Sequence, residues 1–411
     1  MGRFTVTNTL VCWLALGLAG CSSSSPESEA PPVSPGTVEP PAPGTTPPAP
    51  TTEPPGTVTP PGPSLTSVRV HYASSPAKPG AFSLRGSAGP LTWDKNVALT
   101  ASASSSNLYV WSSPDVKTDL EVKPLLGDSW SRGPNYKVKP GQTIDIYPHF
   151  VESHGTVAKK YPAFVSTKLP STRGVWVYLP PTYLENTEAR FGVLYMHDAQ
   201  NLFSAQTAFG GTEWQVDEAM DAGSEDGTIR ETIVVGVENT AARIDELTPT
   251  SDPGYGGGKA NAYLSMMVDE IKPMVDKDLR TIATRDQTAI MGSSLGGLVS
   301  AYAGARRADV FGLVGAMSPS TWWDDKIILT EVASMSTHPS KPLRVYVDSG
   351  DAGTSNDDVT NTTALAARYR TVGYTDQKDL LHVVKPGAQH SEAYWAARLP
   401  NALRFLLGAR P

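Results

Sequence analysis

Cysteine is nearly absent, with only Cys12 and Cys21 among 411 residues. Cys12 lies in an apolar run near the N-terminus that has the features of a leader peptide, which leaves one thiol for the mature chain. A single thiol cannot form an intramolecular disulfide, and it cannot supply the several sulfurs of a Cys₄ zinc site or an iron–sulfur cluster. The sequence therefore excludes a disulfide framework and a cysteine-based metal centre.

Positive charge is also scarce: 34 Lys and Arg stand against 41 Asp and Glu, and the formal net charge is −7. Nucleic-acid-binding surfaces normally carry an excess of Lys and Arg that neutralises phosphates. The composition therefore argues against a nucleic-acid partner. A hydrophobic content of 39% and nine tryptophans are sufficient for a folded core, which excludes disorder of the whole chain.

The apolar run at residues 10–20 is too short to cross a bilayer, which takes about 20 residues of helix. It follows Arg3 and ends in Leu18-Ala19-Gly20-Cys21, the pattern of a signal peptide with a bacterial lipobox. We predict that residues 1–20 are removed and that Cys21 is acylated. An ordinary secretory signal is the alternative. Because Ser22 rather than Asp follows the cysteine, we expect a cell-envelope lipoprotein, anchored in the outer membrane by its lipid.

Residues 21–63 are rich in proline and contain no Lys, Arg or aromatic residue. Such a segment cannot bury enough apolar surface to offset its ordering entropy, and proline favours extended backbone. We predict a disordered tether that lifts the folded part off the membrane.

Residues 64–160 read as short strands separated by turn residues, with clean period-two alternation at residues 143–147. This pattern predicts a small immunoglobulin-like β-sandwich. Trp93, Trp111 and Trp130 could form a sugar-stacking platform, although packing in the core or between domains is the favoured interpretation.

Residues 161–411 alternate strands with helical segments, which predicts an α/β domain with a mostly parallel central sheet. The residues at 232–237 are continuously apolar, as in a parallel strand covered on both faces. Residues 262–279 have a helical apolar period, and Pro273 within them predicts a kink or an interruption.

The segment Gly292-Ser293-Ser294-Leu295-Gly296-Gly297 reads G-x-S-x-G around Ser294. An apolar strand precedes it and a helix-like segment follows, which is the context of a nucleophile elbow. The glycines are required because the turn is too tight for larger side chains, and the helix start favours developing negative charge. We predict Ser294 as a catalytic nucleophile; the alternative is an inert serine in a glycine-rich turn.

A serine nucleophile needs a base and an acid that orients the base, in the chain order Ser, Asp or Glu, His. We predict His390 as the base, because it follows the strand at 380–384, whereas His382 within that strand is interpreted as structural. We predict Asp351 as the acid, with Asp357 and Asp358 as alternatives.

The acidic loop after residue 347 also allows a calcium-site hypothesis, although the full EF-hand pattern is absent. The oxyanion hole needs two donors. One is expected to be the backbone N–H of Leu295, and the other is expected from the loop at residues 196–201. His197 and Asp198 in that loop have no third ligand at usable spacing, so we interpret them as loop-shaping residues and expect no metal and no cofactor.

Taken together, these residues resemble the esterase D/enterochelin esterase-like family of α/β-hydrolases from about residue 165 onward. The matching stretches are Leu194-Tyr195-Met196-His197-Asp198, Gly211-Thr212-Glu213-Trp214, Val235-Gly236-Val237, Gly292 to Gly297, Ser318-Pro319-Ser320-Thr321-Trp322-Trp323 and Gln389-His390-Ser391. In this family an immunoglobulin-like domain precedes the catalytic domain of enterochelin esterases. The N-terminal segment is also loosely similar to early-set and starch-binding modules.

The resemblance implies an α/β-hydrolase fold with Ser294 as nucleophile and His390 as base. It further implies that Gln200 supplies the second oxyanion N–H and that a tryptophan wall, Trp214, Trp322 and Trp323, lines the substrate pocket. The family often carries its acid in a Gly-Thr-x-Asp/Glu pattern, from which Gly350-Asp351-Ala352-Gly353 departs.

The sequence therefore predicts a serine carboxylic-ester hydrolase that acts through an acyl-enzyme on a small-molecule or glycan-linked ester. Acyl transfer to a sugar or glycolipid is an alternative, since it shares the first half-reaction. The second alternative is a glycan-binding lipoprotein with a vestigial hydrolase domain. The complete G-x-S-x-G motif around Ser294, together with His390, argues against it.

Overall fold

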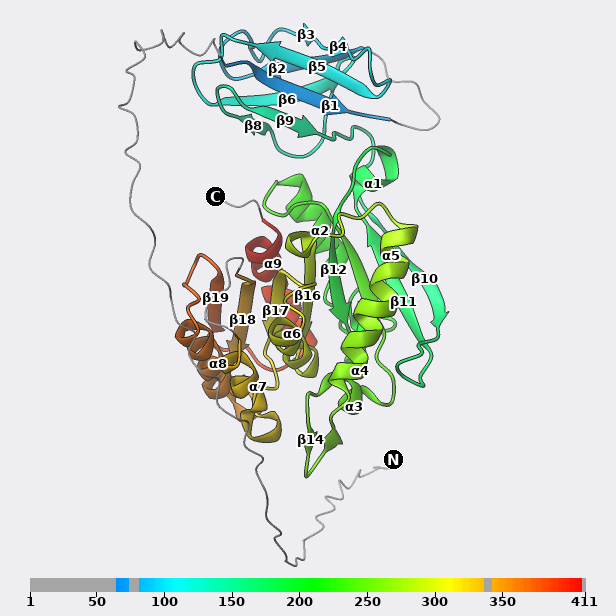
Figure 1. Cartoon of the computed structure of the whole chain (residues 1–411), viewed down its shortest axis with the longest axis vertical. Helices are drawn as coiled ribbons and strands as arrows, with labels where there is room; N and C mark the ends of the chain where they lie inside the picture. The colour runs from blue at the N-terminus through cyan, green and yellow to red at the C-terminus, as the bar shows by residue number, and fades with distance from the viewer. Residues whose placement is uncertain (1–63, 74–80, 336–341, 409–411) are drawn as a thin grey trace, which may run out of the picture. The chain divides into compact units, whose positions relative to one another are not determined.

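The computed structural model describes residues 64–73, 81–335 and 342–408 (Figure 1). The predicted signal peptide, the acylated Cys21 and the tether lie outside the described residues. No helix in the described ranges is both long enough and apolar enough to span a membrane.

The N-terminal region folds into two β-sheets around one apolar core. One sheet has the order β4-β5-β1-β9, and the other has the order β3-β2-β6-β7 with β8 also paired to β6. The strands are β1 (Thr66–His71), β2 (Phe82–Gly86), β3 (Val97–Ala98), β4 (Thr100–Ala101), β5 (Leu108–Ser113), β6 (Leu120–Leu126), β7 (Ser129–Trp130), β8 (Tyr136–Val138) and β9 (Thr143–Ile146). Val68, Leu84 and Val122 are fully buried in this core. The immunoglobulin type of this two-sheet unit stays a prediction.

The predicted boundary at residue 160 is too late. β10 (Thr156–Phe164) is the edge strand of the large sheet of the second region, where it pairs antiparallel with β11 (Arg173–Leu179). Residues 156–160 therefore belong to the α/β region. The sequence of β10, TVAKKYPAF, carries no turn residue before its proline and no helical period that would separate it from the preceding strands, so the change of sheet was not visible in the sequence.

The second region has one eight-stranded sheet of order β10-β11-β13-β12-β16-β17-β18-β19. Its other strands are β12 (Gly192–His197), β13 (Thr232–Val237), β16 (Thr288–Ser293), β17 (Leu313–Met317), β18 (Arg344–Gly350) and β19 (Leu380–Lys385). These six strands are parallel, whereas β10 and β11 form the antiparallel edge. A hairpin of β14 (Ser251–Asp252) and β15 (Gly256–Gly257) lies apart from the sheet.

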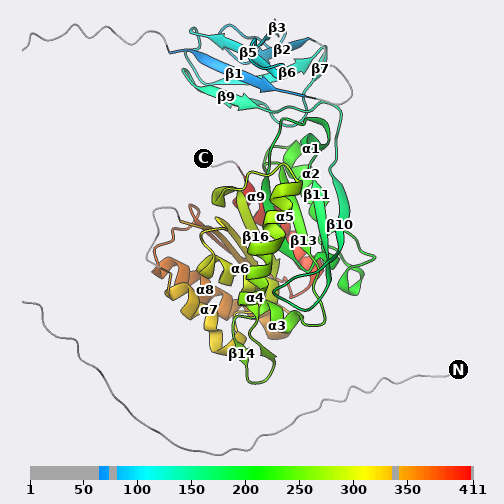
Figure 2. The same cartoon turned by 45° about the vertical axis from the view of Figure 1, so that its right-hand side comes forward.

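Helices cover both faces of this sheet (Figures 1 and 2). They are α1 (Pro181–Glu185), α2 (Val216–Glu225), α3 (Arg243–Leu247), α4 (Ala260–Ser265), α5 (Lys272–Asp278), α6 (Leu295–Arg306), α7 (Trp323–Ala333), α8 (Val359–Thr371) and α9 (Glu392–Leu407). The predicted α/β-hydrolase fold is confirmed.

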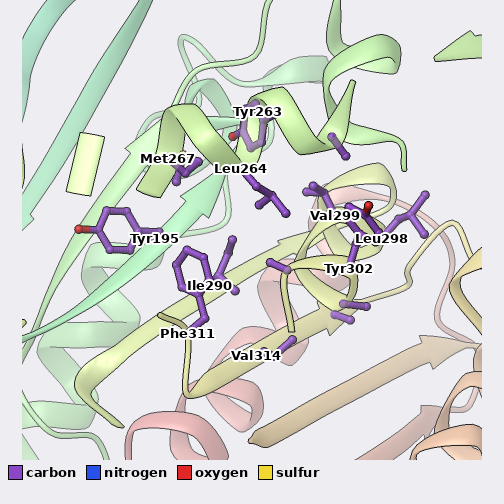
Figure 3. Close-up of a cluster of buried hydrophobic side chains, with 14 of the residues drawn as sticks. Tyr195, Tyr263, Leu264, Met267, Ile290, Leu298, Val299, Tyr302, Phe311 and Val314 are labelled. Atoms are coloured by element: carbon purple, nitrogen blue, oxygen red, sulfur yellow. The ribbon is translucent and has the colours of Figure 1, made fainter. Parts of the chain in front are cut away.

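Alternate residues of the parallel strands enter two separate cores. In β12, Val193 and Tyr195 pack with α4 to α8, whereas Leu194 and Met196 pack with α2 and α9. Figure 3 shows the first core, in which Tyr195 and Ile290 of the sheet face side chains of α4 and α6. This double burial explains why these strands are apolar without alternation.

The long helical segment predicted at 262–279 contains the interruption expected from Pro273. A π-helical stretch, Met266–Ile271, separates α4 from α5. Proline has no amide hydrogen to donate to the preceding turn, and wider turns of this kind accommodate the missing bond.

Candidate active site

Ser294 stands at the sharp turn between β16 and α6, as the sequence predicted. Its backbone has φ 56° and ψ −122°, which is strained for any residue with a side chain. Its amide donates to the carbonyl of Met317 on the neighbouring strand over 3.1 Å, so the turn is tied to the sheet. This strained turn holds the Ser294 hydroxyl at the C-terminal end of the parallel strands.

Two of the three glycines of the turn have no room for a Cβ atom, and at Gly296 a Cβ would be tightly packed. A Cβ at Gly292 would lie 2.8 Å from Cδ2 of His197, and one at Gly297 would lie 2.8 Å from the carbonyl of Met317. A Cβ at Gly296 would meet Cβ of His197 at 3.3 Å. The steric reason given for the G-x-S-x-G pattern therefore holds at Gly292, and it extends to Gly297.

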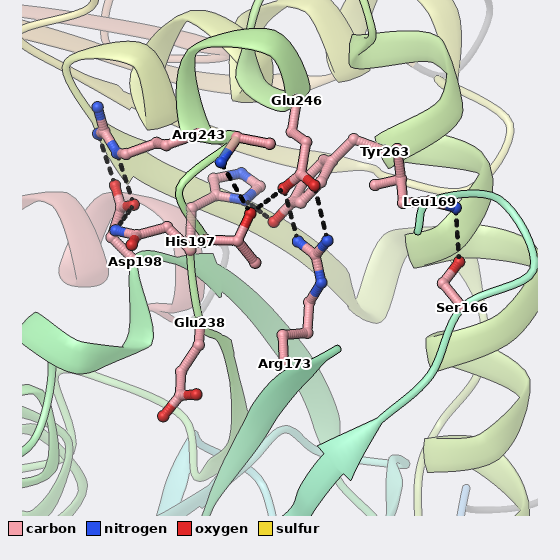
Figure 4. A network of polar contacts seen from close by, with 12 residues as sticks. Ser166, Leu169, Arg173, His197, Asp198, Glu238, Arg243, Glu246 and Tyr263 are labelled. Atoms are coloured by element: carbon pink, nitrogen blue, oxygen red, sulfur yellow. Dashed lines mark hydrogen bonds and ion pairs between the residues drawn. The ribbon is translucent and has the colours of Figure 1, made fainter. Parts of the chain in front are cut away.

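His197 is a packing residue of the elbow. It is buried, and its Nδ1 lies 2.9 Å from the Tyr263 hydroxyl (Figure 4). Its Nε2 lies 3.2 Å from the Ser300 hydroxyl. Burial lowers its pKa to about 4, so the ring is neutral at physiological pH. Nothing in this environment resembles a metal site, and no group of three potential ligands occurs among the described residues.

Asp198 shapes the loop after β12, also as predicted. It lies in left-handed backbone and accepts two hydrogen bonds from Arg243, at 2.8 and 2.7 Å, and one from Asn239 at 2.6 Å (Figure 4). Burial alone would raise the pKa of this carboxyl, but Arg243 and Asn239 lower it. Asp198 therefore stays ionised and fixes the loop that carries Gln200.

The structure corrects the predicted acid. Nδ1 of His390 lies 2.6 Å from Oδ1 of Asp357, whose side chain is fully buried. Asp351 is exposed and instead accepts the amide of Gly387 over 2.7 Å, which ties two loops together. Asp358 accepts a hydrogen bond from Asn361 at 2.6 Å, and within the described residues no hydrogen bond joins it to the imidazole. Asp357, one of the two alternatives, is thus the partner of His390.

A left-handed turn brings Asp357 inward. Four successive residues, Ser355 to Asp358, have φ between 49° and 57°. Such backbone is costly for most side chains, and Asn and Asp tolerate it better than other residues with a side chain. The run Asn356-Asp357-Asp358 was the one local signal that this part of the loop could turn back on itself.

The second carboxylate oxygen of Asp357 is also fully engaged. Oδ2 accepts the Ser318 hydroxyl at 2.7 Å and the amide of Gly350. Burial alone would raise the pKa of Asp357, but the hydrogen bonds from His390, Gly350 and Ser318 lower it. The carboxylate is therefore held both charged and in a fixed orientation.

Four residues to which the sequence analysis assigned no role support this arrangement. Ser318 accepts hydrogen bonds from Trp395 at 3.0 Å and from Arg398 at 2.6 Å, so its own hydrogen is directed to Asp357. Arg398 also pairs with the buried Asp348 at 2.9 Å. These residues come from three segments that are distant in the sequence. Only Asp348 had a local signal, because it lies at the end of a predicted strand, where such sheets place their active sites.

Two cavities meet at His390. One, of about 570 Å³, is lined by Ser294 and Gln200 among mostly polar neighbours. The other, of about 580 Å³, is lined by Tyr255 and Trp322. Ser294 and His390 both border the first cavity, although no hydrogen bond joins their side chains in the described part of the structure.

Both expected oxyanion donors are close to this cavity. Leu295 is the first residue of α6, so its amide is one of those that a helix leaves without an intrahelical acceptor. Gln200 follows β12, in a short 3₁₀ turn, and its side chain is held by Asn239 through bonds of 2.9 and 3.1 Å. Their catalytic role stays a prediction.

The predicted tryptophan wall is only partly right. Trp322 is 41% exposed and borders the second cavity, where its ring lies 5.4 Å from that of Tyr255. Trp323 is buried and donates to the carbonyl of Thr250, and Trp214 is buried against Trp395. Trp323 is the first residue of α7 and packs into the core on one face of the sheet. Trp214 precedes α2 and packs into the core on the other face.

The profile of the family described as "Putative esterase" matches residues 166–406. Among curated proteins, the chain is 25% identical over 246 residues to Uncharacterized protein YbbA of Bacillus subtilis (strain 168), covering 56% of this chain and 91% of that protein. It is 26% identical over 195 residues to Endo-1,4-beta-xylanase/feruloyl esterase of Xylanibacter ruminicola, covering 46% of this chain and 25% of that longer protein.

Among solved structures, the enterobactin esterase FES from Shigella flexneri is similar at 16% identity and a TM-score of 0.48. The match covers 80% of this chain and 88% of that one.

Proposed function

The chain belongs to this esterase family, and from that premise we propose that it is a serine hydrolase that cleaves carboxylic esters through an acyl-enzyme. The observation that carries the proposal is the arrangement around one cavity. A strained serine at an elbow and a histidine held by a buried carboxylate border the same space. Ser294, His390 and Asp357 are the proposed triad.

In the first half-reaction, Oγ of Ser294 attacks the ester carbonyl while Nε2 of His390 accepts its proton. The negative charge on the carbonyl oxygen is stabilised by the amides of Leu295 and Gln200. The intermediate collapses, the C–O bond to the alcohol breaks, and His390 returns the proton to the departing oxygen. Water then releases the acid by the same steps.

Asp357 keeps the proton of the neutral imidazole on Nδ1, which leaves Nε2 free to act as base. Its charge also stabilises the imidazolium that forms during each half-reaction. Because hydrogen bonds keep the pKa of Asp357 low, it does not take up the proton itself.

We propose an aromatic acyl group as the preferred substrate class. The exposed rings of Tyr255 and Trp322 border the cavity that also contains His390. Aromatic side chains of this kind favour offset or edge-on contact with another ring. One relative bears the name of a feruloyl esterase, which agrees with this choice.

We also propose that the enzyme is exported and held at the cell envelope by a lipid on Cys21. The support is the sequence Leu18-Ala19-Gly20-Cys21 after the short apolar run. Replacing the cysteine in Cys21→Ser should release the protein from the membrane fraction with its esterase activity unchanged. Continued membrane association of the variant would refute the anchor.

The mechanism is tested by trapping the acyl-enzyme. The native protein, incubated with a nitrophenyl ester and quenched in acid, should gain the mass of one acyl group on the peptide containing Ser294. Ser294→Ala should lose the adduct and at least about 10³-fold in kcat, with its circular dichroism unchanged. An adduct on another residue, or retention of most activity, would overturn the assignment. Product diverted to an added sugar would indicate acyl transfer.

A further inference from the structure

Two tryptophans of the N-terminal region are exposed side by side. Trp93 is 39% exposed and Trp130 is 41% exposed, and their ring centroids lie 6.2 Å apart at 51°. Trp111, by contrast, is buried in the core between the two sheets. Core packing therefore accounts for Trp111, whereas Trp93 and Trp130 lie outside this core and keep part of their rings exposed.

These indoles form the walls of a shallow depression of about 260 Å³. Lys123 and Asn135 complete its lining. Single exposed apolar side chains are common, but two large neighbouring rings around a hollow with polar side chains at its edge are typical of a ligand site.

The rings are held in place before any ligand arrives. The Arg85 guanidinium lies 5.1 Å from the centroid of the Trp130 ring. The same group donates to the carbonyl of Trp93 at 2.8 Å and to Asn96 at 2.6 Å. Arg85 thus links the loop that carries Trp93 to the hairpin that carries Trp130. A fixed pair of rings loses little conformational entropy on binding.

The polar groups at the edge can bind hydroxyl groups. The Lys123 ammonium has three donors, and one of them is used by the carbonyl of Gly133 at 2.6 Å. The Asn135 amide nitrogen donates to Glu121 at 3.1 Å, and its oxygen remains available as an acceptor. The site therefore offers two apolar faces together with donors and an acceptor beside them.

We propose that Trp93 and Trp130 form a binding site for a neutral polysaccharide, independent of the esterase site. A pyranose ring presents a face of C–H bonds that can pack on an indole, and its hydroxyl groups project sideways toward polar partners. Nucleobases also stack on aromatic rings. Glu121 beside the hollow partly offsets the charges of Lys123 and Arg85, and the net charge of −7 of the whole chain disfavours the approach of a phosphate backbone.

The test measures binding of the purified full-length protein to ester-free glycans, so that the catalytic site contributes no substrate contact. Affinity electrophoresis and calorimetry would use xylan, mixed-linkage β-glucan, amylose and chitin hexasaccharide, with oligo(dT) as the nucleic-acid probe. We expect binding to at least one neutral glycan. Trp93→Ala and Trp130→Ala should each weaken it several-fold, and the double variant by about tenfold or more.

Tyr147→Ala is the matched control. Tyr147 is an exposed aromatic residue of the same region, 38% exposed and stacked on His71, but it lies outside the hollow. Its removal should leave glycan affinity unchanged, and all variants should keep native kcat/KM on a nitrophenyl ester. Failure of the native protein to bind any of the four glycans would overturn the proposal. So would equal loss in the control, undiminished binding by the double variant, or tryptophan-dependent binding to oligo(dT) instead.

Discussion

The hydroxyl of Ser318 donates its hydrogen to Oδ2 of Asp357 over 2.7 Å, on the side of the carboxylate opposite His390. Ser318 follows β17, and Asp357 lies in the loop after β18, so the bond joins the ends of neighbouring strands. The Ser318 oxygen is saturated by Trp395 and Arg398, which leaves the carboxylate as the acceptor for its hydrogen. The bond from Ser318 therefore fixes the orientation of the ionised Asp357 carboxylate, whose other oxygen faces His390.

The first prediction concerns Ser318 as a positioning residue. Ser318→Ala should lower kcat by about 10- to 100-fold with little change in KM, because the Asp357 carboxylate loses a bond that orients it and keeps it charged. The apparent pKa on the acidic limb of the kcat profile should also move, which simple loss of stability would not cause. Steady-state kinetics against pH measures both effects.

Ser349→Ala is the control for this substitution. Ser349 is equally buried at the end of β18, but its hydroxyl has no hydrogen-bond partner in the described structure. Its loss should leave kcat and the pH profile unchanged. Equal effects of the two substitutions would contradict a specific role for Ser318.

The second prediction separates the two aspartates. Asp357→Asn should reduce kcat by about 10³- to 10⁴-fold, since an amide removes the charge and favours the wrong imidazole tautomer. Asp351→Asn should stay within a few-fold of the native rate, because an amide oxygen can still accept the Gly387 amide. The measurement is kcat of both variants with the same nitrophenyl ester. A larger loss of kcat in Asp351→Asn than in Asp357→Asn would identify Asp351 as the acid.

The third prediction contrasts two adjacent tryptophans. Trp323→Ala should lower the free energy of unfolding by about 3–5 kcal/mol, because a fully buried ring leaves a cavity. Trp322→Ala should change it by less than about 1 kcal/mol but raise KM for an aromatic ester by about two- to tenfold. Urea unfolding and kinetics on feruloyl and acetyl esters measure these effects. An equal rise in KM for both esters would argue against ring recognition.

The fourth prediction follows from the neutral, buried His197. Its folded pKa of about 4 lies below its ordinary 6.5, so the unfolded chain binds this proton first as the pH falls. The associated stability is complete above pH 6.5 and is lost progressively toward pH 4, by about 3 kcal/mol. Urea unfolding from pH 7 to pH 4 should show this decline.

Nuclear magnetic resonance of histidine ring protons gives the direct control. The His197 signal should keep its neutral shift at pH 5.5, where an exposed imidazole is mostly charged. Titration of His197 near pH 6.5 in the folded protein would contradict the interpretation.

Residue order alone determined the parts of this protein that depend on local pattern. The G-x-S-x-G turn between an apolar strand and a helix identified Ser294, because only a few backbone shapes join those elements so tightly. The doubly covered strands were recognisable from their unbroken apolar runs, and Pro273 marked the interruption of its helix. His390 was predicted as the base because it follows a strand at the edge where such sheets place their chemistry.

Tertiary structure decided what depends on where loops meet. Asp351, Asp357 and Asp358 are chemically alike and close in sequence, and only the left-handed turn at Ser355 to Asp358 brings Asp357 beneath His390. Trp322 and Trp323 are adjacent and identical, yet one is exposed at a cavity and the other is buried. Burial and hydrogen bonding between distant segments leave no trace in local spacing, so these roles follow only from the folded chain.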